Sequence, residues 1–320
     1  FLHAHPATPA SVASRGLGDV YKRQTEDLKD LIPKEYNKFV NNILETHNIE
    51  TEDLWSGKYG VDYTHNMREA GASDLLEVAL RHPVSLFVNA LVVHPKSVID
   101  SCRKNNVLVG ALTGAREHAL KHAAAGLDVL VVSGTEAGGH CGEISTMVVV
   151  PDVIDAMKSH EDIFVLAAGG IATGRQMAAC MAMGAAGVWC GSVWLTTPES
   201  ETTPTVKNKM LKASSRNTVR SRSRTGKPTR QLQSAWTDAW ASAEALKPLE
   251  MPLQGVLSRP AMDKIDLKAA VGHEGATALA TYYVGQAVGL MNEEKSVKSI
   301  VYEFKEDYAE AVERLSNTIK

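Results

Sequence analysis

From residue 84 onward, short apolar runs rich in β-branched residues alternate with longer amphipathic segments. The runs lie at residues 84–93, 106–114, 128–134, 162–170 and 187–195. Segments of roughly ten to thirteen residues with helical periodicity separate them. Strands that alternate with helices in this way predict βαβ units and a parallel sheet. The runs are apolar throughout rather than alternating, which is typical of parallel strands covered on both faces.

The spacing of about 20–30 residues per unit favours a (β/α)8 TIM-type barrel, with a doubly wound open sheet as the alternative. No G-x-G-x-x-G follows a predicted strand, which argues against a dinucleotide-binding Rossmann fold. We expect the barrel portion at residues 84–200 and a charged, helical segment at 25–83. Residues 201–320 predict an added helical layer, because amphipathic helices are the convincing elements there. Residues 1–24 have no periodicity and predict a non-native or disordered leader.

Composition narrows the class of protein. Of 320 residues, 44% are apolar and 22% are charged, which is typical of a globular chain with a large core. The net charge of −3 gives no bulk attraction to nucleic acid or to an anionic membrane, so neither is an expected partner. There is no CxxC pair, which favours reduced thiols in a cytoplasmic protein. The four cysteines are Cys102, Cys141, Cys180 and Cys190.

Glycine-rich turns follow three of the predicted strands, where parallel α/β proteins bind ligands. These turns hold Gly134 with Gly138 and Gly139, Gly169 with Gly170, and Gly191 with Ser192. The stretch "LAAGGIATGRQMA" predicts a strand, a Gly-Gly turn and a helix capped by Thr173, which would present N–H groups to an anion. Two consecutive turns of this kind favour a phosphate site over glycines that only relieve crowding.

The stretch "VLVVSGTEAGGHCGEIS" places His140 at the end of the first of these turns. With a usual pKa near 6.5, this histidine suits the removal of a proton from a weakly acidic C–H group. A structural histidine bonded to a neighbouring loop is the alternative. A Cys/His nucleophile formed with Cys141 is disfavoured because sequence neighbours seldom face each other, and the pair lacks the spaced partners of a metal site.

The motifs "GTEAGGHCGE" and "LAAGGIATGRQMAACMAMGAAGVWCGSVWLTT" resemble the nitronate monooxygenase family, formerly called 2-nitropropane dioxygenase. This family of flavin-dependent barrels includes a flavin-containing enoyl-acyl-carrier reductase. The resemblance covers about residues 84–200, with weaker echoes in "RTGKPTRQLQSAWTDAW" and "YYVGQAVGLM". It is nearest to an actinobacterial type associated with coenzyme A thioester metabolism, including steroid ring degradation.

The resemblance implies an FMN-bearing barrel. His140 matches the family's active-site histidine, implied as a base or substrate anchor beside the flavin. The implied cofactor-binding residues are Ser133 and Gly134 at the strand end, Gly138 and Gly139 against the flavin, and Gly169, Gly170, Gly191 and Ser192 around its phosphate.

Two departures from the family pattern stand out. Ser133 occupies a position where many relatives carry glutamine, so one polar contact to the flavin is expected to be lost. The family also opens with a strand of the type "PIVQAPM" and two more strands, and nothing in residues 1–83 matches them. We therefore expect the five strands to be the fourth to eighth of the barrel, in a truncated gene whose first three strands are lacking.

The run "RNTVRSRSRTGKPTR" (216–230) holds six positive charges and no acid. A solvated loop at the barrel rim is the favoured interpretation. A clamp for the phosphates of an acyl-CoA or a nicotinamide nucleotide is the functional alternative. Nucleic acid is disfavoured because interleaved aromatic residues are missing.

The sequence thus predicts an FMN-dependent oxidoreductase that oxidises nitronates or nitroalkanes with O2 as co-substrate. An NAD(P)H-dependent flavin reductase acting on an unsaturated acyl-CoA or other acyl thioester is the alternative within the same scaffold. A hypothesis of another class is an inactive remnant that binds a phosphorylated ligand or nothing.

Overall fold

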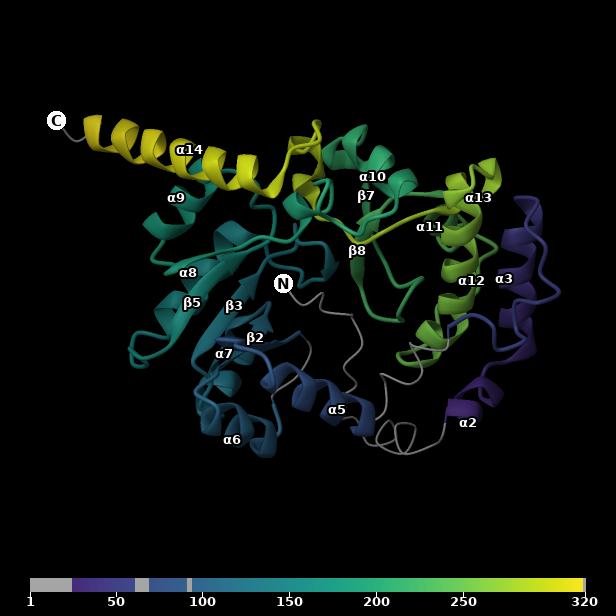
Figure 1. Cartoon of the computed structure of the whole chain (residues 1–320), viewed down its shortest axis with the longest axis horizontal. Helices are drawn as coiled ribbons and strands as arrows, with labels where there is room; N and C mark the ends of the chain where they lie inside the picture. The colour runs from purple at the N-terminus through teal and green to yellow at the C-terminus, as the bar shows by residue number, and fades with distance from the viewer. Residues whose placement is uncertain (1–24, 61–68, 91–93, 319–320) are drawn as a thin grey trace. The chain divides into compact units, whose positions relative to one another are not determined.

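A five-stranded parallel sheet forms the centre of one part of the chain (Figure 1). The computed structural model describes residues 25–60, 69–90 and 94–318, so the predictions for residues 1–24 lie outside the described residues. The chain divides into two compact units, which are described separately. Of the described residues, the sheet unit comprises 79–90, 94–202, 210–217 and 284–318, and the helical unit comprises 25–60, 69–78, 203–209 and 218–283.

The sheet of the sheet unit has the order β1-β2-β3-β5-β6, and every pairing is parallel. Its strands are β1 (Leu86–Asn89), β2 (Leu108–Thr113), β3 (Val129–Ser133), β5 (Phe164–Ala168) and β6 (Gly187–Trp189). All five lie within the runs predicted as strands, so the βαβ prediction is confirmed.

Helices follow the strands in this unit (Figure 1). They are α6 (Lys96–Lys104), α7 (Arg116–Ala124), α8 (Thr146–Ala156), α9 (Gly174–Ala182), the 3₁₀ helices η1 (Ser192–Trp194), η2 (Ser215–Asn217) and η3 (Gln286–Leu290), and α14 (Val297–Asn317). A two-residue strand, β4 (Gly139–His140), lies between β3 and α8.

Strand β3 is buried along its whole length, because both of its faces are covered. Leu130 and Val132 belong to a core cluster with α7 and α8, including Val149 and Val153. Residues Val129 and Val131 point to the opposite face, into a cluster with side chains of β1, β2 and β5. Alternate side chains therefore fill two different cores, which explains why the run is apolar throughout.

The long helix α14 packs on α9 at a glycine. A Cβ added to Gly174 would lie 2.1 Å from the carbonyl oxygen of Phe304, so this contact requires the absence of a side chain. Beyond this contact the apolar side chains of α14 are not all covered, because Val312 and Leu315 are 41% and 50% exposed.

The helical unit combines residues from both sides of the sheet unit's sequence. Its elements are α2 (Thr25–Asp30), α3 (Lys34–Thr46), α5 (Glu69–Leu80), α10 (Pro204–Leu211), β7 (Thr218–Ser221), β8 (Thr229–Leu232), α11 (Ala235–Ala239), α12 (Leu253–Ala270) and α13 (Glu274–Leu279), of which α5 and α10 end in the sheet unit. The chain passes from the sheet unit to the helical unit after residue 202, and residues 210–217 and 284–318 belong to the sheet unit again.

The prediction that residues 201–320 contain helices alone is wrong, because β7 and β8 form an antiparallel hairpin. The basic run lies in this hairpin, and its interpretation as a solvated loop is wrong as well. Arg224 and Arg230 are 7% and 8% exposed. The Nη1 of Arg224 donates to the carbonyl of Thr281 at 3.3 Å, and its guanidinium lies 4.5 Å from the ring centroid of Tyr283. Hydrogen bonds and ring contacts thus allow charged side chains to be buried where the sequence suggested solvent.

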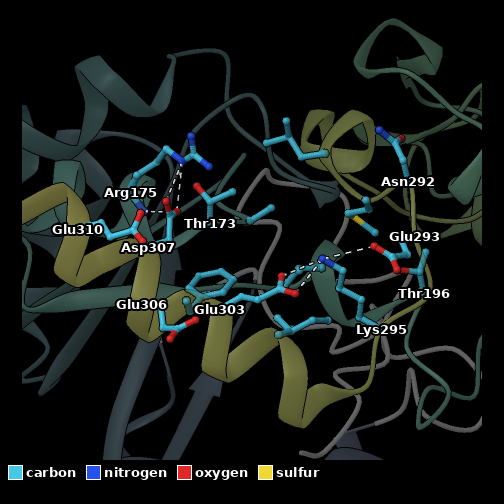
Figure 2. Close-up of a pocket in the computed structure, with 17 residues that line it drawn as sticks. Thr173, Arg175, Thr196, Asn292, Glu293, Lys295, Glu303, Glu306, Asp307 and Glu310 are labelled. Carbon is cyan, nitrogen blue, oxygen red and sulfur yellow. Dashed lines mark hydrogen bonds and ion pairs between the residues drawn. The ribbon is translucent and has the colours of Figure 1, made fainter.

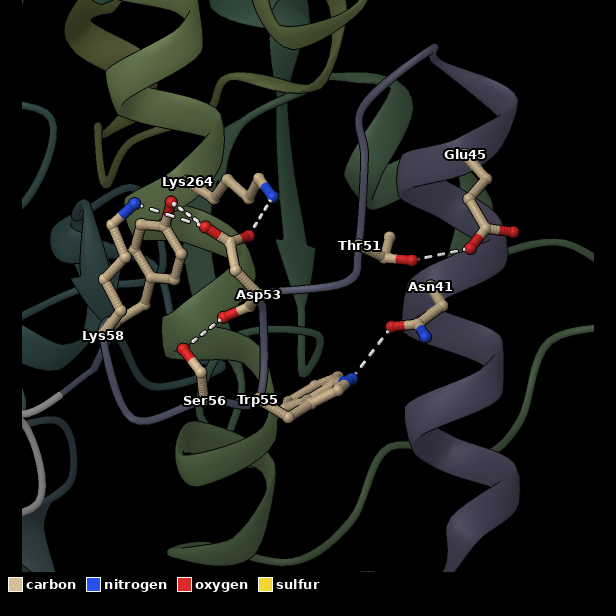
Figure 3. A network of polar contacts seen from close by, with 9 residues as sticks. Asn41, Glu45, Thr51, Asp53, Trp55, Ser56, Lys58 and Lys264 are labelled. Atoms are coloured by element: carbon tan, nitrogen blue, oxygen red, sulfur yellow. Dashed lines mark hydrogen bonds and ion pairs between the residues drawn. The ribbon is translucent and has the colours of Figure 1, made fainter.

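A polar network joins the segment after α3 to helix α12 (Figure 3). The ammonium of Lys264, whose side chain is 4% exposed, pairs with the carboxylate of Asp53. Lys58 pairs with the same carboxylate at 3.3 Å. The pKa of Asp53 is lowered to about 2, and the main cause is the hydrogen bond that its carboxylate accepts from Lys264.

Candidate functional site

The carboxyl ends of β3, β5 and β6 lie side by side. Ser133 is in register with Ala168, and Ala168 with Trp189. The N–H of Gly134 continues the ladder by donating to the carbonyl of Ala168 at 3.1 Å. The sheet therefore brings together the three glycine turns that the sequence singled out.

The Gly-Gly turn after β5 is held by one side chain from the helix that follows it. Gly169 and Gly170 have φ of +100° and +73°, which favours glycine. The Nε2 of Gln176 donates to the carbonyl of Gly170 at 2.7 Å, and its Oε1 accepts from the N–H of Ala172 at 2.8 Å. Thr173 caps α9 by accepting from the N–H of Gln176, so the predicted cap is confirmed.

The first turn of α9 is already occupied by a carboxylate of the chain. Asp307 of α14 accepts from the N–H of Arg175 at 2.7 Å and pairs with its guanidinium at 3.0 Å. The expectation that this helix end presents its N–H groups to an external anion is therefore wrong. Within the described ranges, the N–H groups of Gly170 and Gly191 have no hydrogen-bond acceptor in the chain.

The turn after β6 is open on the side where a Cβ of Gly191 would stand. An added Cβ would meet no atom within 4 Å, and its φ of −118° suits any residue, so neither crowding nor conformation requires glycine there. Ser192 begins η1, and its Oγ accepts from the N–H of Gly285 at 2.8 Å. A serine hydroxyl that accepts in this way keeps its own proton to donate. A short helix at the end of the last strand is the usual place of a barrel phosphate site.

The turn between β3 and His140 is crossed by a second backbone segment. A Cβ on Gly138 would lie 2.7 Å from the N of Gly285 and the carbonyl carbon of Val284, so this crossing requires glycine. Gly139 has a φ of +75°, and a Cβ there would meet nothing within 4 Å. His140 follows in β4 and is half-buried. Packing thus accounts for Gly138, whereas Gly139 leaves open space next to the histidine.

Glu136, to which the sequence assigned no role, organises this turn. Its carboxylate accepts from the N–H and the Oγ1 of Thr146, the residue that begins α8. The only signal in the sequence is a glutamate between the strand and the glycines, ten residues before the helix that it caps.

The neutral donors around these turns fit the phosphate of a flavin mononucleotide. Backbone N–H groups exposed in tight turns form concave anion sites, to which Gly170, Gly191 and the hydroxyl of Ser192 would contribute. Cysteine chemistry fits the site poorly, because burial, aided by Cys180, raises the pKa of the Cys190 thiol to about 12. Within the described part of the chain, no group of His, Cys, Asp or Glu side chains could hold a metal ion. No helix there is long and apolar enough to cross a bilayer.

A separate cavity of about 500 Å³ lies between α9 and α14 (Figure 2). Thr173 and Arg175 line one side, and Lys295 pairs with Glu303 at 2.8 Å on the other. Gly174 is among the lining residues, but His140 and the glycines of the three strand-end turns are not. It is therefore distinct from the candidate site.

The parallel β/α architecture, with glycine turns at the carboxyl ends of its strands, is that of the TIM-barrel class. Among known protein families, the family model described as nitronate monooxygenase matches residues 11–307 of the chain. The chain belongs to the nitronate monooxygenase family, whose members are in general flavin-dependent oxidoreductases.

Several relatives and structures are similar to the chain. "Putative monooxygenase Rv1533" of Mycobacterium tuberculosis is 45% identical over 92% of this chain and 78% of its own length. A Rhodococcus jostii dehydrogenase, named for an octahydro-indene-carboxyl-CoA, is 38% identical over 59% of this chain, which spans about half (52%) of that enzyme. The structure of a nitroalkane oxidase from Streptomyces ansochromogenes has a TM-score of 0.71 at 26% identity, covering 88% of this chain and 78% of its own. FabK from Thermotoga maritima has a TM-score of 0.63 at 31% identity, covering 77% and 75%.

Proposed function

We propose that the chain is an FMN-dependent oxidoreductase that oxidises nitronates or nitroalkanes with O2. The observation that carries this proposal is the meeting of three glycine turns at the ends of β3, β5 and β6, beside a half-buried histidine. FMN supplies the electron-transfer chemistry when it is bound. The protein supplies binding, orientation and one proton-accepting group.

The cradle proposed for the flavin phosphate uses neutral donors. The N–H groups of Gly169, Gly170 and Gly191 and the hydroxyl of Ser192 would bind its oxygens, as in other anion sites built from backbone groups. Ser133 and Gly134 end β3 next to this cradle, and Gly138 and Gly139 shape the turn along the flavin.

His140 is proposed as the base that removes the proton α to the nitro group. The Nδ1 or Nε2 atom of a neutral imidazole would accept that proton, leaving the electron pair on the substrate. A nitronate has already lost this proton, so its oxidation does not need the base.

This difference gives a sharp test of His140. We expect His140→Asn to retain FMN, to keep most nitronate oxidation and to lose turnover of the neutral nitroalkane by about 10²-fold or more. Cys141→Ser is the matched control, because it changes the neighbouring half-buried side chain and should alter neither activity. Equal turnover of neutral nitroalkane by the wild type and His140→Asn would remove the histidine from the mechanism.

A second candidate is an NAD(P)H-dependent flavin reductase acting on an unsaturated acyl-CoA. Similarity to a carboxyl-CoA dehydrogenase and to FabK supports it. Oxygen uptake with nitronate in the absence of NAD(P)H favours the first function, and NAD(P)H oxidation stimulated by an enoyl-CoA favours the second. A chain that retains no FMN through gel filtration would contradict both and leave the third hypothesis, a remnant without catalysis.

A further inference from the structure

Glu136, in the β3–β4 turn, binds other parts of the candidate site through both its side chain and its backbone. Its two carboxylate oxygens lie 3.2 and 3.0 Å from the N–H of Thr146, and Oε2 lies 2.8 Å from the Thr146 hydroxyl. Because Thr146 is the first residue of α8, the Glu136 carboxylate also complements the positive end of that helix. The turn that carries His140 is thereby fixed to α8.

Thr146 extends this connection to the Gly-Gly turn. Its single hydroxyl proton is shared between the Glu136 carboxylate at 2.8 Å and the carbonyl of Gly169 at 3.1 Å, and the residue is 7% exposed. The packing here leaves no space for a side chain at Gly134, because a Cβ on this residue would lie 2.2 Å from the same hydroxyl and 2.6 Å from the Glu136 carboxylate. Gly170 is packed against Glu136 too, since its added Cβ would lie 3.1 Å from the Cβ of the glutamate.

The backbone of Glu136 makes the connection to the third turn. Its carbonyl accepts from the N–H of Gln286 at 2.9 Å, and the preceding N–H, of Gly285, donates to Ser192 Oγ at 2.8 Å. Segment 284–286 therefore joins the His140 turn to the residue that begins η1.

We propose that Glu136 is a positioning residue that holds His140 in register with the phosphate cradle, through Thr146 on one side and segment 284–286 on the other. This inference rests on the proposed function of the cradle. It assigns to Glu136 no contact with substrate or flavin. Binding of FMN and orientation of His140 are coupled because the Glu136 carboxylate binds Thr146, which also contacts the Gly-Gly turn.

The first test uses paired variants at the hydrogen bond itself. Thr146→Val keeps the shape of the side chain but removes the hydroxyl donor, whereas Thr146→Ser retains it. We expect Glu136→Gln and Thr146→Val each to weaken FMN binding about tenfold, as measured by quenching of FMN fluorescence, and the double variant to be little weaker than either. Thr146→Ser should bind as the wild type does. Glu161→Gln, an exposed carboxylate outside the site, is the control.

Two further measurements separate positioning from a general loss of stability. In Glu136→Gln, turnover of neutral nitroalkane should fall at least tenfold more than turnover of its nitronate, whereas a smaller folded fraction would lower both equally. Hydrogen exchange of the flavin-free variant should rise in residues 134–140, 169–170 and 284–286 together.

The outcomes distinguish this inference from the proposed function. Absence of FMN binding by the wild type contradicts the proposed function, while joint exchange of the three segments would still support Glu136 as their common tie. Normal FMN affinity and an unchanged ratio of the two turnovers in Glu136→Gln would overturn the inference even if the wild type is an active flavoenzyme. Exchange that rises in residues 134–140 alone would overturn it as well.

Discussion

The buried histidine His122 should make the stability of the sheet unit fall in mild acid. It lies on α7, is 5% exposed, and its Nδ1 has no hydrogen-bond partner among the described residues. Burial, and secondarily the nearby His94 and His118, lowers its pKa from 6.5 to about 4. The folded chain therefore holds this imidazole neutral at a pH where the unfolded chain protonates it.

The size of the effect follows from linkage. Because the folded pKa is depressed, the contribution is fully present above pH 6.5, where both states are neutral, and is lost as the pH falls toward 4. A full shift of this size corresponds to about 3 kcal/mol, and the loss between pH 7 and pH 5 to about 2 kcal/mol. Burial also lowers the pKa of His94, which adds in the same direction.

Urea unfolding at pH 7 and pH 5 measures this loss directly. We expect His122→Gln to be less stable than the wild type at pH 7 but to lose about 2 kcal/mol less on going to pH 5. His118→Gln, an exposed histidine one turn earlier on the same helix, is the control and should keep nearly all of the pH dependence. An identical pH dependence in His122→Gln and the wild type would refute the reasoning.

Three further predictions concern glycine, charge and thiol. Gly191→Ala should keep the thermal stability of the wild type but weaken FMN binding about tenfold or more, as fluorescence titration would show. Gly134→Ala should lower the melting temperature, because its Cβ would lie 2.2 Å from a neighbouring hydroxyl. Equal melting temperatures of the two variants would contradict this prediction. Asp53→Asn should lower the urea midpoint more than Lys264→Met, since the first leaves a buried ammonium without its carboxylate and the second removes it; the reverse order would be contrary evidence. Cys190, with its pKa raised to about 12, should resist iodoacetamide at pH 8 until the chain unfolds, which mass spectrometry can follow, and rapid labelling of the folded chain would contradict the raised pKa.

The sheet could be predicted because its information is local. Each strand of the sheet unit is a short apolar run bounded by turn residues, and a strand such as β3 is apolar throughout because both of its faces are covered. The C-terminal hairpin could not, since β7 and β8 carry polar residues whose partners, such as Thr281 for Arg224, lie far along the chain. Long-range hydrogen bonds of this kind leave no periodicity to read.

The candidate site shows the same division. Glycine positions at the ends of strands were visible in the sequence, and the parallel register brings them together. Their reasons differ, however: Gly138 is required by a backbone that arrives from residue 284, while no atom within 4 Å would obstruct a side chain at Gly191. Glu136 and Asp307 act through partners distant in sequence. The bond between Glu136 and Thr146, and the occupation of the start of α9 by Asp307, could therefore be found only in the three-dimensional structure.

The position of Asp307 at the start of α9 has a consequence for variants shortened at the C-terminus. Removing α14 would take away the carboxylate that neutralises the positive end of α9, one turn from the Gly-Gly turn. The N–H groups at the start of α9 would then be available to sulfate or phosphate from the buffer, close to the proposed phosphate cradle. Helix α14 thus serves as a built-in counter-ion, and a shortened chain should respond to sulfate in a way that the longer one does not.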